Sequence, residues 1–168
     1  MSPHDTLTPD RVRRGFKPER YHPLRCTTVK GDLTGASGID QALVTKWKSS
    51  APASADSEYL LLLSYLPLKR FRAIPRFLKY TFQIERQLRQ SDGLIGYSLQ
   101  AELLSKNFWT LSAWQDEKAL MTFVRRVPHG EIMQQLAPDM GRTGFTRWTE
   151  RGSRIPPSWS DAKARMQQ

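Results

Sequence analysis

The chain has 168 residues, of which 39% are hydrophobic, and it carries a formal net charge of +10 at pH 7. This length suits one domain with appendages, and the apolar content is enough for a hydrophobic core. The longest apolar run, residues 59–68, is interrupted by Ser64 and Pro67 and falls far short of the ~20 residues of a membrane span. The single cysteine, Cys26, excludes an intramolecular disulfide and a cysteine-based metal cluster.

The first part of the chain has the composition of an extension. Proline and glycine are scattered through it, and residues 49–57 are small or polar, as in a linker. No apolar segment of a secretory signal is present near the N-terminus, which predicts a cytoplasmic protein. We therefore expect an extension over residues 1–57, partly disordered or linker-like, a folded domain over 58–150, and a tail with a short helix over 151–168.

The folded domain is predicted to begin with a strand and a helix. Residues 59–65 form a short apolar run, typical of a strand buried on both faces, and Pro67 ends it. Over residues 74–88 apolar side chains recur at three- and four-residue spacing, and Pro75 suits the first turn. This spacing predicts a helix, which the following Asp-Gly pair ends.

Two strands, a second helix and a last strand come next in the chain. Residues 94–102 and 108–114 are β-type runs with a short polar connection, which predicts a hairpin. An acidic pair suits the start of the next helix, which must end before Pro128. A short helical piece over 130–136 and a strand over 145–150 complete the domain.

The order βαββαβ predicts an α+β, ferredoxin-like fold, with a four-stranded antiparallel sheet and two helices on one face. The second face of the sheet then needs a cover, and we expect a second copy of the chain to supply it, as a homodimer that forms an α/β barrel. In the tail, Ser158 and Asp161 fit the start of a last helix. Its Trp159 is expected to dock on the body or on a partner.

The segment from Phe108 to His129, FWTLSAWQDEKALMTFVRRVPH, resembles the third strand, second helix and following histidine of antibiotic-biosynthesis-monooxygenase-like proteins. Among these it is most similar to an uncharacterised, spheroidene-monooxygenase-like branch (DUF3291-like). The resemblance spans residues 58–162, including the run GRTGFTRW from Gly141. It implies a dimeric α/β barrel. The superfamily includes cofactor-free oxygenases, haem-degrading enzymes, haem-binding hydroxylases and members with no demonstrated activity.

His129 is the candidate catalytic residue. The resemblance places it at the iron ligand of the haem-degrading members, although it follows the helix by a shorter interval. Its ordinary pKa lies near neutrality, so it suits a haem ligand or a general base. The alternative is that it caps a turn or hydrogen-bonds a backbone carbonyl. Phe123 stands near the position of those members' tryptophan, and Ser64 is the small polar residue of the first strand, where they have asparagine. These departures weigh against haem degradation and leave haem binding open.

A pocket for a flat apolar substrate is the second predicted feature. Its alternative is that the same side chains fill the core and the dimer interface. The predicted pocket residues are Trp114, Phe123, Trp109, Tyr97 and Ser64.

A basic stripe is the third feature, because Arg72, Arg76 and Lys79, with Arg86, fall on one side of the predicted first helix. The stripe would suit phosphates, the carboxylates of a ligand such as haem, or an anionic membrane surface. The alternative is an ordinary solvated face. No RNA-binding signature accompanies it, so nucleic acid is not an expected partner.

The sequence has no flavin or nicotinamide motif, no metal-ligand cluster and no Ser-His-Asp triad. The residues and the resemblance together indicate two functions. One is a small-molecule monooxygenase-like oxidoreductase with an apolar pocket. Whether this oxidoreductase binds haem as a cofactor is left open. The other is a non-catalytic dimeric module that binds a ligand or serves a structural role.

Overall fold

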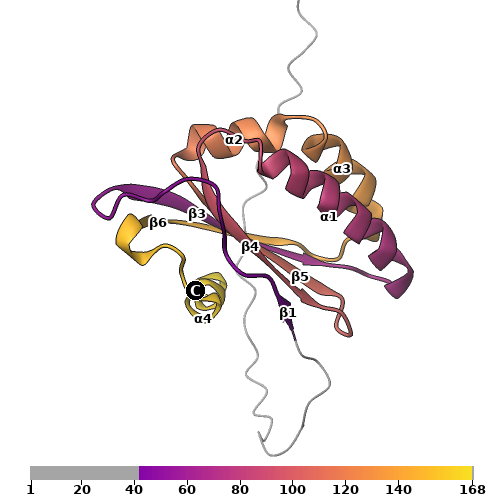
Figure 1. Cartoon of the computed structure of the whole chain (residues 1–168). Coiled ribbons are helices and arrows are strands. Elements are labelled where there is room, and N and C mark those ends of the chain that lie inside the picture. The colour runs from indigo at the N-terminus through magenta and orange to yellow at the C-terminus, as the bar shows by residue number, and fades with distance from the viewer. Residues whose placement is uncertain (1–41, 168) are drawn as a thin grey trace, which may run out of the picture. The chain divides into compact units, whose positions relative to one another are not determined.

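The computed structural model describes residues 42–167. Its centre is an antiparallel sheet in which four long strands lie in the order β4-β5-β3-β6 (Figure 1). The long strands are β3 (Glu58–Pro67), β4 (Leu94–Glu102), β5 (Asn107–Trp114) and β6 (Gly144–Arg151). This is the strand order of the predicted ferredoxin-like fold, with the first and third strands of the unit at its centre.

The sheet has six strands rather than the predicted four. The two additional strands, β1 (Leu43–Val44) and β2 (Lys48–Ser49), are two residues long and both pair with β4. Such short segments carry no readable alternation in sequence, which is why they were not predicted. They widen the sheet at the β4 edge.

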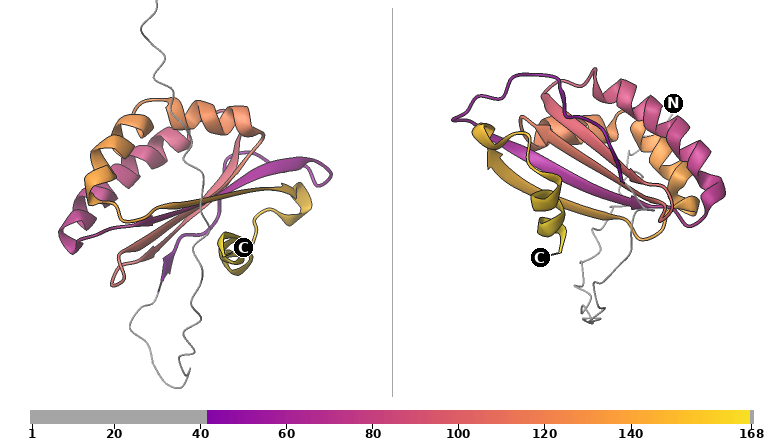
Figure 2. Two further views of the ribbon diagram at one scale, coloured as in Figure 1. Left: turned by 180° about the vertical axis from the view of Figure 1, so that it is seen from behind. Right: turned by 60° about the horizontal axis from the view of Figure 1, so that its bottom comes forward.

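Three helices lie on one face of the sheet, namely the two predicted for the fold and the short piece predicted over 130–136, and a fourth lies on the other face (Figures 1 and 2). Asp116 caps α2 by accepting a hydrogen bond from the backbone N–H of Ala119 at 2.7 Å, and Ser158 caps α4 in the same way from Asp161 at 3.1 Å. The helices are α1 (Ile74–Leu88), α2 (Glu117–Arg125), α3 (His129–Leu136) and α4 (Trp159–Met166), with 3-10 turns η1 (Phe71–Ala73), η2 (Ala137–Asp139) and η3 (Gly152–Arg154).

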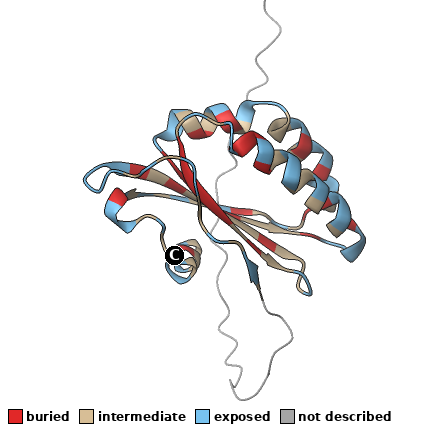
Figure 3. Ribbon diagram, viewed as in Figure 1, coloured by how far each residue is buried: buried red, intermediate tan, exposed pale blue. Residues whose placement is uncertain are grey.

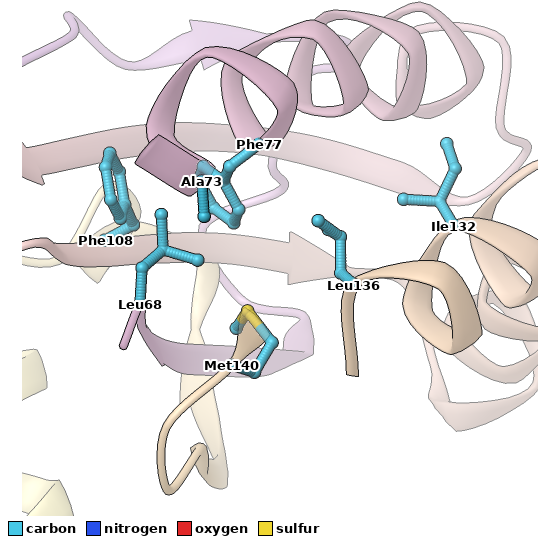
Figure 4. Close-up of a cluster of buried hydrophobic side chains, with 7 residues drawn as sticks. All are labelled: Leu68, Ala73, Phe77, Phe108, Ile132, Leu136 and Met140. Atoms are coloured by element: carbon cyan, nitrogen blue, oxygen red, sulfur yellow. The ribbon is translucent and has the colours of Figure 1, made fainter. Parts of the chain in front are cut away.

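Two clusters of buried side chains join the three helices to the sheet. In the first, the rings of Phe77 from α1 and Phe108 from β5 lie 4.4 Å apart. Figure 4 shows this cluster, which comprises Leu68, Ala73, Phe77, Phe108, Ile132, Leu136 and Met140. The second cluster, here called the tryptophan cluster, comprises Leu88, Leu94, Tyr97, Trp114, Leu120 and Phe123. Burial on this scale is what holds α1, α2 and α3 to the sheet.

The second face of the sheet is covered in part by the chain itself. Ala162 of α4 is fully buried against Leu63 and Leu111, and Trp159 packs on the same cluster. Trp159 therefore docks on the body of the protein, which is one of the two alternatives predicted for it. The homodimer that we expected to cover this face stays a prediction.

The chain ahead of β3 lies close against the same face. A Cβ atom at Gly96 would lie 2.5 Å from the indole nitrogen of Trp47, and one at Gly152 would lie 1.9 Å from the carbonyl oxygen of Ser54. Both positions therefore need glycine, because any larger residue would displace residues 42–57. Residues 1–41, on which most of the predicted disordered extension falls, lie outside the described part of the chain.

Within residues 42–167, no helix has both the length and the apolar composition needed to cross a bilayer.

Candidate functional site

His129 is the first residue of α3, and its ring is held in one tautomer. Nδ1 lies 3.2 Å from the backbone carbonyl oxygen of Val124. A carbonyl oxygen only accepts, so Nδ1 carries the hydrogen and Nε2 keeps its lone pair. Burial lowers the pKa of His129 below its ordinary 6.5, against the opposing effect of the bond to Val124. The imidazole is therefore neutral at pH 7, with Nε2 as a hydrogen-bond acceptor or metal ligand.

Gln87 of α1 fixes the position of His129. The Oε1 atom of this buried side chain accepts the backbone N–H of His129 at 3.1 Å. Its Nε2 donates to the carbonyl oxygens of Phe123 at 3.1 Å and Arg126 at 3.3 Å. One side chain thus ties α1 to the junction of α2 and α3. No sequence pattern indicated this role, because a lone glutamine on a helix is more often solvated.

The predicted pocket residues do not line one cavity. Phe123, Trp114 and Tyr97 do lie together, since all three belong to the tryptophan cluster, with the rings of Phe123 and Trp114 5.2 Å apart. Trp114 and Tyr97 are 0% and 1% exposed, so they fill the core. Trp109 lies on the opposite face of the sheet, in contact with Tyr65 at a ring distance of 4.4 Å. It is excluded from a pocket on the helix side, because neighbouring residues of a strand point to opposite faces.

Ser64 occupies a different place, in the middle of β3, opposite Thr110 of β5 and Phe145 of β6. Its side chain is on the helix side of the sheet and is 7% exposed. Among the described residues no hydrogen bond to its hydroxyl is found. It is thus a buried polar group whose donor and acceptor are available to a ligand.

Part of this face of β3 and β6 is incompletely covered by the side chains of the three helices. Leu60 and Leu62 lie on the central strand and face the helices, yet both are only half-buried. Phe145, on the same face of β6, is 52% exposed. Leu60 and Leu62 pack against the tryptophan cluster, and the Phe123 ring of that cluster lies 4.8 Å from the His129 ring. Leu60 and Leu62 are therefore connected to His129 through the packed side chains of the tryptophan cluster.

A cavity of about 440 Å³ lies elsewhere in the structure. Tyr59 and Ile95, which line it, belong to the cluster on the sheet face opposite α1, α2 and α3. None of the predicted site residues lines it. Its lining residues are Ala51, Pro52, Ser57, Glu58, Tyr59, Ile95 and Gln115.

A buried carboxylate forms the main ionic cluster of the structure. Glu85 of α1 accepts hydrogen bonds from the Tyr97 hydroxyl at 2.8 Å, from Arg89 at 3.0 Å and from the Lys48 ammonium. Burial of Glu85 opposes its ionisation, but the bonds from Lys48, Arg89 and Tyr97 outweigh it and lower its pKa from 4.5 to about 2. Glu85 therefore links α1 to β2 through Lys48 and to β4 through Tyr97. The Tyr97 hydroxyl is used in this cluster, so it does not serve as a pocket donor.

The predicted anion-facing residues do not converge on His129. Arg72 lies in η1, while Arg76 and Lys79 lie in the first half of α1, and all three are exposed. Gln87, which holds His129, is eight residues beyond Lys79, or about 12 Å along the helix axis. Arg72, Arg76 and Lys79 therefore belong to a different part of the surface from the candidate site, whereas Arg86, the last cation of the stripe, directly precedes Gln87.

No protein-family model matches the chain, and no curated protein matches its sequence. Solved structures do match its fold. A "Putative monooxygenase" from Fusobacterium nucleatum has a TM-score of 0.54 at 10% identity, over 64% of this chain and 51% of that one. The haem-degrading enzyme from Listeria monocytogenes has a TM-score of 0.50 at 17% identity, over 67% of this chain and 72% of that one. A "putative antibiotic biosynthesis monooxygenase" from Deinococcus radiodurans has a TM-score of 0.48 at 15% identity, over 53% of this chain and 89% of that one.

The chain thus spans about half the length of the Fusobacterium structure that it matches. At these identities the likeness concerns the fold alone. The narrower, DUF3291-like branch that the sequence resembles is reached by none of these matches and stays a prediction. The protein therefore has the ferredoxin-like fold that monooxygenase-like and haem-degrading proteins share.

Proposed function

We propose that the protein is a monooxygenase-like oxidoreductase that binds an apolar small molecule on the helix side of β3, with His129 as its reacting or ligating group. The observation that carries this proposal is the 3.2 Å contact between Nδ1 of His129 and the carbonyl oxygen of Val124, which favours the tautomer with the hydrogen on Nδ1. A hydrogen bond from one ring nitrogen to a backbone carbonyl orients a histidine whose other nitrogen acts as a base or as a metal ligand.

The chemistry of the ring suits proton transfer near neutral pH. Because burial lowers the pKa of His129, the ring is unprotonated at pH 7 and its Nε2 atom can accept a proton from a bound substrate. The protonated ring would keep its bond to Val124, since an imidazolium donates from both nitrogens. His129 can therefore take up and release a proton without moving.

The incompletely covered apolar surface of β3 and β6 suits a ligand with one polar atom. Leu60 and Leu62 are half-buried and Phe145 is 52% exposed, so a ligand would remove apolar area from water there. Ser64, opposite Phe145, offers a single hydroxyl to orient the ligand. A mostly apolar wall with a few polar groups is the usual composition of a small-molecule site.

Haem fits this site in one respect only. A neutral imidazole with a fixed tautomer, as at His129, is what an axial iron ligand needs, and bound haem would supply oxygen activation. The cations predicted to hold its carboxylates, Arg72, Arg76 and Lys79, do not fit, because they lie on another part of the surface. The oxidoreductase proposal therefore does not depend on haem.

A non-catalytic dimeric module is the second candidate, and a specific observation favours it. Trp114 and Tyr97 are fully buried and Phe123 is packed on Trp114, so these aromatic side chains serve the core. In such a module His129 would serve packing alone, through its contact with Phe123 and its bond to Val124.

A haemin titration of the full-length chain tests whether His129 ligates haem. The Soret band would be followed for the wild type, for His129→Ala, and for a control in which the other two histidines, His4 and His22, are replaced by alanine. A saturable spectrum that His129→Ala removes and the control keeps would assign haem to the site, and the absence of such a spectrum would restrict the proposal to chemistry without haem. The melting temperature of each variant would be measured in parallel.

A second titration tests the apolar surface without haem. Nile red would be added to the wild type, to Leu62→Lys, and to Leu43→Lys, a control at a leucine that is 61% exposed on β1. The proposal predicts saturable binding that Leu62→Lys weakens and Leu43→Lys does not. If neither haemin nor Nile red binds, and His129→Ala lowers only the melting temperature, the protein is the packing module.

A further inference from the structure

The outer surface of the segment that contains η1 and α1 is strongly basic. Residues 69–90 include seven lysines and arginines and one acid, Glu85. That acid is buried and already bound by Lys48 and Arg89, so it does not neutralise the surface. The seven cations are Lys69, Arg70, Arg72, Arg76, Lys79, Arg86 and Arg89.

Four of these cations share the side of the segment that faces solvent. Phe77 and Leu88 turn the opposite side of α1 to the core, and Figure 3 shows the exposed side of the helix running along its length. Arg76 is 3.7 Å from Asp139, a long ion pair. Among the described residues, no salt bridge joins Arg72, Lys79 or Arg86 to an acid. The solvent-facing side of a helix usually carries both acidic and basic side chains, whereas this side of α1 carries only basic ones.

Large apolar side chains project from the same segment. Phe82 is 69% exposed and lies three residues after Lys79 and four before Arg86, so it stands among the cations. Phe71 in η1 is 56% exposed, with the Lys106 ammonium 4.3 Å from the centre of its ring. Exposed phenylalanines surrounded by lysine and arginine are typical of helices that lie in the interface of a membrane.

We propose that this face, formed by Arg72, Arg76, Lys79, Phe82 and Arg86, binds the surface of an anionic lipid bilayer. The cations would meet the lipid headgroups, and Phe82 would enter the boundary between headgroups and acyl chains. The inference is independent of the proposed function, since no residue of this face contacts His129.

A bilayer fits the face better than a nucleic acid does. Ferredoxin-like domains that bind single-stranded RNA stack bases on aromatic residues of the open sheet face. Here the tryptophans of that face, Trp109 and Trp148, are covered by α4, whose Lys163 and Arg165 lie over their rings at 4.6 and 5.1 Å. The exposed face of α1 offers one phenylalanine rather than a stacking platform.

Sedimentation with vesicles tests the proposal on the full-length protein. Phosphatidylcholine vesicles with about one-third phosphatidylserine would be compared with pure phosphatidylcholine vesicles, for the wild type, Lys79→Glu/Arg86→Glu and Phe82→Ser. The control is Arg151→Glu/Arg154→Glu, which makes the same change in charge at the end of β6 and in η3. Each cation near an anionic surface contributes about fivefold to binding.

The proposal predicts binding to the anionic vesicles only. It predicts a loss of at least about 25-fold in Lys79→Glu/Arg86→Glu, a weaker loss in Phe82→Ser, and near wild-type binding in the control. Binding should fall as salt rises from ~0.1 to ~1 M, because the screening length shortens from about 10 to about 3 Å. The proposal is overturned if anionic vesicles do not bind at low salt, or if the control loses as much as the α1 variant. It is also overturned if single-stranded RNA competes the protein off the vesicles while Phe82→Ser has no effect.

Discussion

The carboxylate of Glu85 stabilises the fold by an amount that can be worked out from its surroundings. Its side chain is 9% exposed, and its three donors lower its pKa from 4.5 to about 2. At about 1.4 kcal/mol per pH unit, this difference corresponds to about 3 kcal/mol. Lys48 and Arg89 are 39% and 59% exposed, so solvent screens them in part. We therefore expect Glu85→Gln to lower the free energy of unfolding by about 2 to 3 kcal/mol at pH 7.

The pH dependence gives this prediction its sign. The pKa of Glu85 is lower in the folded state than in the unfolded state, so its contribution is complete above the unfolded value, 4.5. It is lost as the pH falls toward 2. The difference in stability between the wild type and Glu85→Gln should therefore shrink by about half at pH ~3.

Urea denaturation followed by tryptophan fluorescence measures both quantities. Glu117→Gln is the matched control, because Glu117 is 69% exposed and its ion pair with Arg147 is on the surface. This control should change stability by less than about 0.5 kcal/mol. The prediction for Glu85 is refuted if Glu85→Gln is no less stable than the control at pH 7. It is also refuted if the loss of unfolding free energy relative to the wild type is the same at pH 7 and pH ~3.

Three other substitutions test the packing of the fold. Gly152→Ala should lower the melting temperature strongly, because the new Cβ atom would lie 1.9 Å from the Ser54 carbonyl oxygen. A melting temperature equal to that of the wild type would contradict this close contact between Gly152 and Ser54. Gly96→Ala should cost about 1 to 3 kcal/mol and shift tryptophan emission to the red as Trp47 leaves its site, which a combined melt and emission scan would detect. Trp114→Ala should cost about 3 to 5 kcal/mol in urea denaturation, since Trp114 is 0% exposed, and a cost below about 1 kcal/mol would show that it is not a core residue.

The long elements of the fold are readable from local pattern. The predicted strand over 94–102 has the observed bounds of β4, and the apolar spacing over 74–88 covers the length of α1. Both carry a clear periodicity over nine or more residues. The proline that ends α2 and the serine that caps α4 were also visible, because caps and breakers act locally.

The parts that sequence did not predict depend on contacts between distant residues. Lys48 and Glu85 are 37 positions apart, and Tyr97 is 12 beyond Glu85, so their shared cluster has no signature in any window. The same holds for the cover of the second sheet face by α4, which requires knowing where the chain turns after β6. At the candidate site, His129 was predicted from its residue type and motif. Its partner Gln87 could be found only from the packing of α1 on the α2–α3 junction.

The tautomer of His129 is the sharpest test of the proposed function, because that function depends on a neutral ring with a free Nε2 atom. Long-range ¹H–¹⁵N spectra of histidine-labelled protein at pH ~7.5 distinguish the two tautomers, and the spectrum of His129→Ala identifies the signal. We expect a protonated Nδ1 and an unprotonated Nε2, with the neutral imidazole persisting below pH 6.5. A proton on Nε2, or a ring that is charged at pH 7, would contradict this expectation.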